Sequence, residues 1–133
     1  MVIDTSAILA LLFNEPDADA IAAALDGDPV RLLSAASCLE AAVVVEARLG
    51  AAASREFDLL LHKAAIDVVA VTGEQVDVAR AAWRRFGRGR HEAGLSFGDC
   101  CAYALAATTG EPLLFSGSNF AKTDIGQVRL GRQ

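Results

Sequence analysis

Short apolar segments with strand character alternate with longer helical segments along almost the whole chain, and this alternation most restricts the possible fold. The strand-like segments are apolar on both faces, as the buried strands of a parallel sheet are. Parallel strands need long connections, which are usually helices that cover the sheet. The pattern therefore predicts an α/β fold with three layers, α/β/α, around a short and mainly parallel sheet.

Glycine and proline residues separate the predicted elements from one another. Strands are expected at residues 1–4, 30–33, 66–71 and 113–115, with a last short strand at 128–130. Helices are expected at residues 5–13, 17–25, 37–49, 54–65, 74–86 and 97–109, and a glycine- and arginine-rich loop at 87–94. No linker, repeat or low-complexity tract interrupts the 133 residues. A single domain over residues 1–133 is therefore expected.

Composition excludes several classes of protein. Hydrophobic residues make up 53% of the chain and charged residues 22%, which excludes a disordered chain. No apolar run reaches the roughly 20 residues of a membrane span, and the start of the chain has no room for a signal peptide, so we expect a cytoplasmic protein outside the membrane. The three cysteines lack zinc-site spacing and are expected to be small buried side chains. The net charge of −5 disfavours diffuse coating by nucleic acid.

Three carboxylates occupy positions where helices begin. Asp4 follows the first strand, Glu40 lies one turn into the helix after the second strand, and Asp99 lies at the start of the helix at 97–109. Ligands of parallel sheets bind at the carboxyl ends of the strands. Three carboxylates in one cleft repel each other unless a cation joins them. Oxygen ligands alone favour Mg²⁺ or Mn²⁺, and such sites commonly hydrolyse phosphodiesters with metal-activated water.

A second interpretation of these acids is that they cap helices. Aspartate is a preferred N-cap residue, and Ser37-x-x-Glu40 and Ser96-x-x-Asp99 match the capping box. The helices that follow are largely apolar, and an acid at the start of such a helix is costly unless it is paired. The spacing of the acids does not decide between the two interpretations.

Four segments in consistent order resemble the motifs of PIN domains, specifically those of VapC-type toxins from bacterial toxin–antitoxin pairs. They are Met1-Val-Ile-Asp4-Thr-Ser-Ala7, Ser34-Ala-Ala-Ser-Cys-Leu-Glu40, Gly87-Arg-Gly-Arg-His-Glu-Ala-Gly-Leu-Ser-Phe-Gly-Asp-Cys100, and Gly110-Glu-Pro-Leu-Leu-Phe115 with Thr123-Asp-Ile125. The resemblance runs from residue 1 to about residue 125 and so covers nearly the whole chain.

The resemblance implies one α/β/α domain with Mg²⁺-dependent endoribonuclease activity on structured RNA such as tRNA or rRNA, with Mn²⁺ as a substitute ion. It also implies a homodimer that a VapB-type antitoxin holds inactive. By motif position, Asp4, Glu40 and Asp99 are the catalytic, metal-binding acids. Thr5 or Ser6 would support a carboxylate or a metal-bound water through its hydroxyl.

The C-terminal segment departs from the family pattern. Family members carry an acid in a Gly-x-Asp-Phe stretch, where this chain has Gly117-Ser-Asn119-Phe120. The resemblance makes Asn119 and the nearby Asp124 weaker metal ligands, and an exposed turn residue is an equal alternative for Asp124. The departure places a second metal site in doubt. It also gives the alternative function, a catalytically weakened PIN domain that binds RNA or an antitoxin.

Basic residues are concentrated in one segment, because five of the twelve Lys and Arg residues lie between Arg80 and Arg90. This segment leads into the helix of Asp99 and can hold RNA phosphates near that acid. RNA contacts are predicted for four arginines, namely Arg84, Arg85, Arg88 and Arg90. A solvated surface is the alternative. Trp83 and Phe86 are expected to pack beneath their helix, with stacking on bases as the alternative. His91 is expected to be a surface residue without a catalytic role, with phosphate binding or proton transfer as the alternative.

Overall fold

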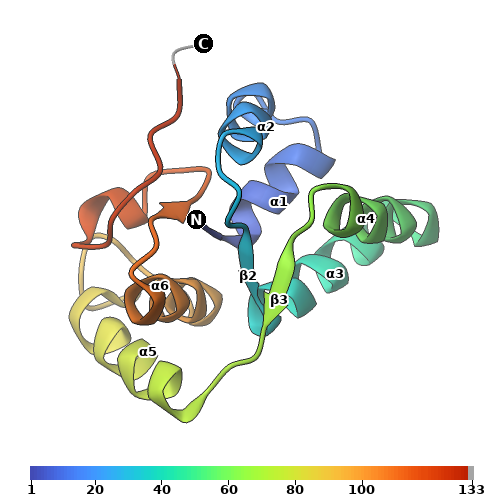
Figure 1. The fold of residues 1–133 in the computed structure, drawn as a ribbon. Coiled ribbons are helices and arrows are strands. Elements are labelled where there is room, and N and C mark those ends of the chain that lie inside the picture. The colour runs from blue at the N-terminus through green and yellow to red at the C-terminus, as the bar shows by residue number, and fades with distance from the viewer. Residues whose placement is uncertain (132–133) are drawn as a thin grey trace.

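The computed structural model describes residues 1–131 and contains a four-stranded parallel sheet between two layers of helices (Figure 1). The strands are β1 (Val2–Ile3), β2 (Leu32–Ser34), β3 (Asp67–Val69) and β4 (Leu113–Leu114). The helices are α1 (Thr5–Leu12), α2 (Ala18–Asp26), α3 (Ala35–Leu49), α4 (Ala51–Lys63), α5 (Gly73–Phe86), α6 (Phe97–Thr109) and the 3-10 helix η1 (Phe120–Lys122). The predicted α/β/α fold is confirmed. The last two residues of the predicted domain, 132–133, lie outside the described range.

The strand order is β3-β2-β1-β4, and each neighbouring pair is parallel. The chain therefore builds outward from β1 through β2 to β3, and then returns to add β4 on the other side of β1. In open α/β sheets, ligand crevices form at the carboxyl ends of the strands where the strand order reverses in this way. Because β1 ends at Ile3, Asp4 is the first residue beyond the carboxyl end of the strand at this reversal.

Alternate side chains of the strands enter two separate hydrophobic cores. Ile3 and Leu114 belong to the core formed with α1–α4, whereas Val2 and Leu113 belong to the core formed with α5 and α6. Figure 1 shows these two groups of helices on opposite sides of the strands. All four side chains are fully buried. A shift of strand pairing by one residue would exchange the side chains of the two faces. Burial stabilises each of these side chains by roughly 1.5–3 kcal/mol, so it fixes the register of β1 and with it the position of Asp4.

Two helices begin two or three residues earlier than predicted. α3 begins at Ala35 because Ser34 is its N-cap, and the Ser34 hydroxyl accepts the N–H of Ala36 at 3.2 Å. α4 begins at Ala51, directly after Gly50, since the alanines that follow this glycine are the strongest helix formers. Within residues 1–131, no helix combines the length and the apolar character that crossing a membrane requires.

The strand boundaries also differ from the prediction. The strand expected at 128–130 is wrong, because Gln127 forms one isolated bridge with Leu113 and the pairing ends there. The segment before it forms η1, which the sequence pattern did not predict. β2 is shifted by about two residues, and β3 is shorter than the predicted 66–71. β3 lies at the sheet edge, where Val68 is 49% exposed, so fewer contacts extend it.

The three cysteines are free thiols on α3 and α6. Cys100 is buried, as predicted, whereas Cys38 and Cys101 are only partly buried. Burial raises the pKa of the Cys100 thiol to about 11. Cys100 therefore stays protonated at neutral pH and behaves as a small apolar side chain.

Candidate active site

Asp4 is buried at the carboxyl end of β1, with 2% of its surface exposed. It is the N-cap of α1, and its Oδ2 accepts the N–H of Ser6 at 2.9 Å. Its other oxygen, Oδ1, is buried and has no hydrogen-bond partner among the described residues. A buried carboxylate oxygen without a partner is costly, so it needs a water molecule or a cation. Asp4 is therefore both a helix cap and a candidate metal ligand.

Burial raises the pKa of the Asp4 carboxyl to about 7. Hydrogen bonding by the Ser6 hydroxyl and N–H lowers this pKa, whereas the negative charges of Asp99 and Glu40 raise it. The last effect arises because charges of like sign interact at short range in a poorly solvated region. Two acids that are distant from Asp4 in the sequence therefore lie near enough to act on its carboxyl at this edge of the sheet.

Glu40 lies on the second turn of α3 and reaches the first turn of α6. A Cβ atom added to Gly98 would lie 2.5 Å from Glu40 Oε2 and 2.6 Å from Oε1, so the carboxylate rests against the Gly98 backbone. Any larger residue at position 98 would take the space of this carboxylate. Gly98 is thus a functional position that the sequence interpretation missed. Its signal was a glycine in the first turn of a helix, directly before a candidate ligand.

The capping interpretation holds for two of the three acids. Besides Asp4, Asp99 forms a capping box: its Oδ2 accepts the N–H of Ser96 at 2.9 Å, and its own N–H donates to Ser96 Oγ at 3.2 Å. The capping box predicted for Glu40 is wrong, because the helix begins at Ala35 and Glu40 is too far inside it. Capping engages only one oxygen of each aspartate, so it does not compete with a ligand at the other.

The two hydroxyls after Asp4 have different partners. Thr5 Oγ1 donates to a backbone carbonyl oxygen in the first turn of α3 at 3.2 Å and so joins α1 to α3. Ser6 Oγ accepts the N–H of Ser116 at 3.0 Å, and Ser116 Oγ donates to Asp17 Oδ2 at 2.6 Å. The Ser6 proton remains available to Asp4 or to a water, so Ser6 fits the predicted supporting role better than Thr5. Ser116 and Asp17 extend this support and were not predicted.

The acidic residues fit a hydrated divalent cation. Within residues 1–131, no three His, Cys, Asp or Glu side chains lie close enough together to hold one ion directly. The unpartnered Oδ1 of Asp4 and the nearby charges of Asp99 and Glu40 nevertheless form an anionic site made of oxygen atoms. Mg²⁺ keeps several waters when it binds through one or two carboxylates, so direct contact with every acid is not required.

The two weaker ligand candidates differ in their surroundings. Asn119 is exposed, and its side chain makes no capping hydrogen bond to η1. Asp124 uses both carboxylate oxygens: Oδ1 accepts the Tyr103 hydroxyl at 2.6 Å, and Oδ2 pairs with Arg85 Nη1 at 2.9 Å. Asp124 therefore links the segment after η1 to α5 and α6. Neither the metal-ligand interpretation nor the exposed-turn interpretation included this structural role.

The predicted RNA-binding arginines are exposed, but they are not equivalent. Arg85 is paired with Asp124, and its guanidinium lies 4.7 Å from the centre of the Phe86 ring. Arg84 and Arg88 make no ion pair within the described residues. Arg84 and Arg88 are therefore freer than Arg85 to contact a phosphate.

The aromatic residues near these arginines also differ from one another. Phe86 is buried, as predicted, but Trp83 is 44% exposed and does not pack beneath its helix. The guanidinium of Arg90 lies 4.3 Å from the centre of the Trp83 ring. His91 has a structural role, since its Nδ1 accepts the N–H of Ala93 at 3.0 Å and its ring meets the edge of Phe86.

Comparison with known proteins agrees with this architecture. The family model described as PIN domain matches residues 1–126. Ribonuclease VapC30 of Mycobacterium tuberculosis is 56% identical over 130 residues, which cover 98% of this chain and 99% of that protein. The crystal structure of Mycobacterium tuberculosis VapC20, described as a "Sarcin-Ricin loop cleaving toxin", has a TM-score of 0.78 at 20% identity and covers 96% of this chain and 98% of its own. A toxin–antitoxin complex from Klebsiella pneumoniae has a TM-score of 0.68 at 17% identity, with 92% of each chain covered.

These matches support different conclusions. The two solved structures are distant in sequence and support the fold alone. The family model spans nearly the whole chain, and VapC30 matches it over nearly its full length with more than half of the residues identical. The chain therefore belongs to the PIN domain family, as a VapC-type ribonuclease.

Proposed function

We propose that this protein is the Mg²⁺-dependent endoribonuclease toxin of a type II toxin–antitoxin pair, acting in the cytoplasm on structured RNA such as tRNA or rRNA, with Mn²⁺ as a substitute ion. The observation that carries the proposal is the buried Asp4, whose Oδ1 has no partner within residues 1–131 and whose pKa is raised by burial and by the charges of Asp99 and Glu40. A buried carboxylate beside two further acids, the partly buried Asp99 and the exposed Glu40, does not serve stability alone. Binding of a divalent ion for ribonuclease chemistry explains why these acids lie together.

The acids have distinct roles in this proposal. Asp4 binds the ion, and Glu40 and Asp99 complete the negative charge around it. When bound, a divalent ion lowers the pKa of water and offsets the charge of the phosphate. The N–H and hydroxyl of Ser6 favour the ionised form of Asp4 and so offset part of the effect of burial on its pKa. Asn119 is exposed and Asp124 is occupied by Tyr103 and Arg85, so we propose one ion and not two.

Substrate RNA is held by the arginines on and after α5. Arg84, Arg88 and Arg90 supply the positive charge for the phosphates, since guanidinium groups bind phosphate in a planar, two-pronged geometry. Arg85 is bound to Asp124 and contributes less. The net charge of −5 does not oppose this arrangement, because some of the negative charge belongs to the cation site.

The proposal is tested by incubating wild-type protein and Asp99→Asn with a total tRNA and rRNA pool in Mg²⁺, in Mn²⁺ and in EDTA. Asparagine keeps a carbonyl oxygen for the Ser96 N–H but removes the charge near the ion. We expect the wild type to cut in either metal and not in EDTA, and the variant to be at least about 100-fold slower, beyond the range of losses seen when outer-shell metal partners are changed. A wild type that cuts no faster than Asp99→Asn would contradict the enzymatic function.

The alternative function, a weakened PIN domain that binds RNA or an antitoxin, is favoured by one observation, namely the neutral Asn119 in place of the usual acid. It predicts that the wild type binds RNA in the same experiment and leaves it intact.

We also propose that the protein forms a homodimer and binds a VapB-type antitoxin. The family supports this proposal, and the solved toxin–antitoxin complex from Klebsiella pneumoniae shares the fold. Co-expression with the product of an adjacent small DNA-binding gene, followed by light scattering, tests both partners. Recovery of a free monomer would contradict them.

A further inference from the structure

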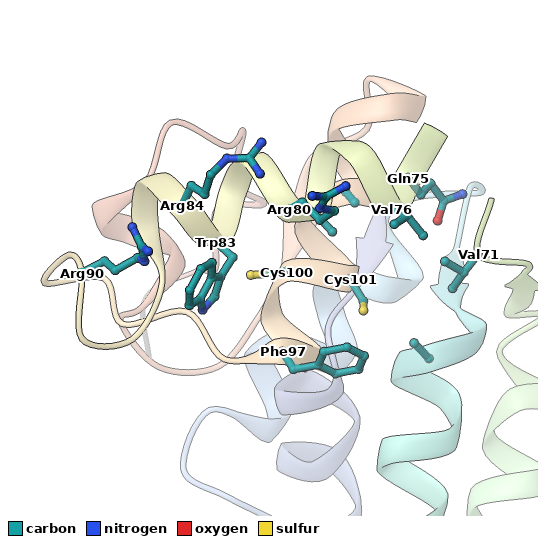
Figure 2. A pocket seen from close by; sticks show the side chains of 13 residues that line it. Val71, Gln75, Val76, Arg80, Trp83, Arg84, Arg90, Phe97, Cys100 and Cys101 are labelled. Atoms are coloured by element: carbon teal, nitrogen blue, oxygen red, sulfur yellow. The ribbon is translucent and has the colours of Figure 1, made fainter. Parts of the chain in front are cut away.

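A groove of about 610 Å³ lies between α5 and the first turns of α6 (Figure 2). Its volume is within the roughly 300–1,000 Å³ that small-ligand sites occupy. Figure 2 shows the side chains of Trp83, Phe97, Cys100 and Cys101 around the space between these helices. The groove is mostly apolar, and none of the described residues that line it is acidic. Neither the metal site nor the core explains it.

The groove lies next to the candidate active site. Phe97, in its wall, is two residues before Asp99, and Gly98 between them supports the Glu40 carboxylate. Ala36, also in the wall, lies one helical turn before Glu40 on α3. The groove and the acids therefore share the starts of α3 and α6.

Two aromatic side chains are presented to solvent here. Phe97 is 83% exposed and Trp83 is 44% exposed. Trp83 is also supported from its own loop, because a Cβ on Gly87 would lie 2.6 Å from Trp83 Cδ1 and 2.8 Å from Nε1. Arg90 covers the Trp83 ring at 4.3 Å. Aromatic rings held open to solvent at a groove are the surfaces on which unpaired bases stack.

The charges around the groove favour an anionic occupant. Arg80, Arg84 and Arg90 line it, with no carboxylate among the lining residues to balance them. An apolar floor with a cationic rim matches the two parts of a nucleotide, a flat base and a phosphate. A purely apolar helix would match the floor and leave the charges of Arg80 and Arg84 without an anionic partner.

We propose that this groove binds one unpaired nucleotide of the RNA substrate beside the cleaved phosphate, with its base against Trp83 and Phe97 and its phosphates on the arginine rim. This inference rests on the proposed ribonuclease function and narrows its substrate. A base in a duplex must first leave its stack, which has an energetic cost, so the groove selects loops and single strands over paired RNA.

The test uses an unstructured RNA decamer that carries 2-aminopurine, whose fluorescence falls when the base stacks, in EDTA to prevent metal-dependent cleavage. Phe97→Leu keeps an apolar side chain but removes the flat ring, and Leu59→Ala is the matched control, since Leu59 is 51% exposed on α4 and lies outside the groove. We expect Phe97→Leu to bind the decamer about 5- to 100-fold more weakly and to lose the quenching, as the usual worth of base–aromatic stacking implies. Leu59→Ala should bind the decamer as tightly as the wild type does. Phe97→Leu should bind the duplex form of the decamer as tightly as the wild type does.

Equal affinity of Phe97→Leu and wild type for the single strand would overturn the inference. So would a change confined to the oligomeric state in light scattering, or to antitoxin binding, because the occupant would then be a protein. The cleavage assay on the RNA pool distinguishes failure of the nucleotide-binding groove from failure of the ribonuclease function. A wild type that cuts RNA while Phe97→Leu binds normally leaves the ribonuclease function intact and removes the nucleotide groove.

Discussion

The acids and the arginines lie close together in the fold but are held in opposite ways. Asp4 is buried and bonded to the main chain of α1, Asp99 is bonded to the main chain before α6, and Glu40 rests on a glycine. The arginines extend from α5 and its following loop into solvent, and among the residues that the structure describes only Arg85 of this group forms an ion pair with an acid. Fixed positions suit a metal ion with strict geometry, whereas extended side chains suit RNA of variable shape. The difference predicts that substitutions in the acids act on metal binding and those in the arginines on RNA affinity.

The largest effect concerns stability without metal. The folded-state pKa of Asp4, about 7, lies above its ordinary value of 3.8. The protonated carboxyl therefore favours folding fully below pH 4, and this contribution is lost as the pH rises through 7. We expect the unfolding free energy in EDTA to fall by roughly 2–4 kcal/mol between pH 4 and pH 8, as denaturant titrations can measure. Asp4→Asn, which keeps the N-cap, should flatten this dependence; an unchanged slope would show that Asp4 is not its source.

Gly98→Ala separates site geometry from folding. The new Cβ would displace the flexible end of Glu40 and not the backbone, so the fold should remain and thermal stability should not fall. We expect Mn²⁺ affinity and RNA cleavage to fall by about 10- to 100-fold, as when the supporting shell of a metal site is disturbed. Gly73→Ala is the matched control, because position 73 has free space and an ordinary φ. Gly110→Ala, at the other end of α6, is unsuitable because the φ of Gly110 is +74°. A Gly98→Ala variant with wild-type metal affinity would remove Glu40 from the site.

The arginines can be compared within their own region. Arg84→Ala should weaken RNA binding by about 3- to 10-fold and reduce the salt dependence of binding by about one phosphate contact. Arg85→Ala should have a smaller effect, because Arg85 is already paired with Asp124. Metal affinity should be unchanged in both, including in the double variant. Binding titrations at two salt concentrations measure this, and equal losses for the two arginines would argue against the distinction.

The smallest effect is expected for Asn119→Asp. Asn119 is exposed, so an added carboxylate there would interact weakly with an ion at Asp4. We expect the cleavage rate to rise by no more than about threefold and the number of bound ions to stay at one, in single-turnover assays and calorimetry. A second bound ion would show that this position limits the natural site.

The sequence was sufficient to predict the order of the helices and strands but not the atomic arrangement of the acids. Alternation of apolar segments and glycine breaks was sufficient for the order of the elements, because backbone propensity and burial are local properties of a sequence. The start of α3 was predicted at Ser37, where a capping box matches, and only the three-dimensional path of the chain makes Ser34 the N-cap. A strand at 128–130 failed for a similar reason, because pairing depends on a distant partner.

The candidate site shows the same limit at the level of single atoms. Asp4, Glu40 and Asp99 were identified by position and by resemblance, but spacing carries no information about which oxygen is free or which glycine supports Glu40. Gly98 and Ser116 act through contacts between residues far apart in the chain. Trp83 was expected to pack beneath its helix. The structure shows it exposed, against the loop that follows the helix.

We propose that Asp4 anchors a divalent cation that Glu40 and Asp99 share. Calorimetric titration of Mn²⁺ into the wild type and into Asp4→Asn at pH 8 tests it most directly, because it needs no RNA. We expect about one bound ion in the wild type and an affinity at least about 100-fold lower in Asp4→Asn, beyond the loss expected for a supporting residue. Equal Mn²⁺ affinity in the two proteins would contradict it.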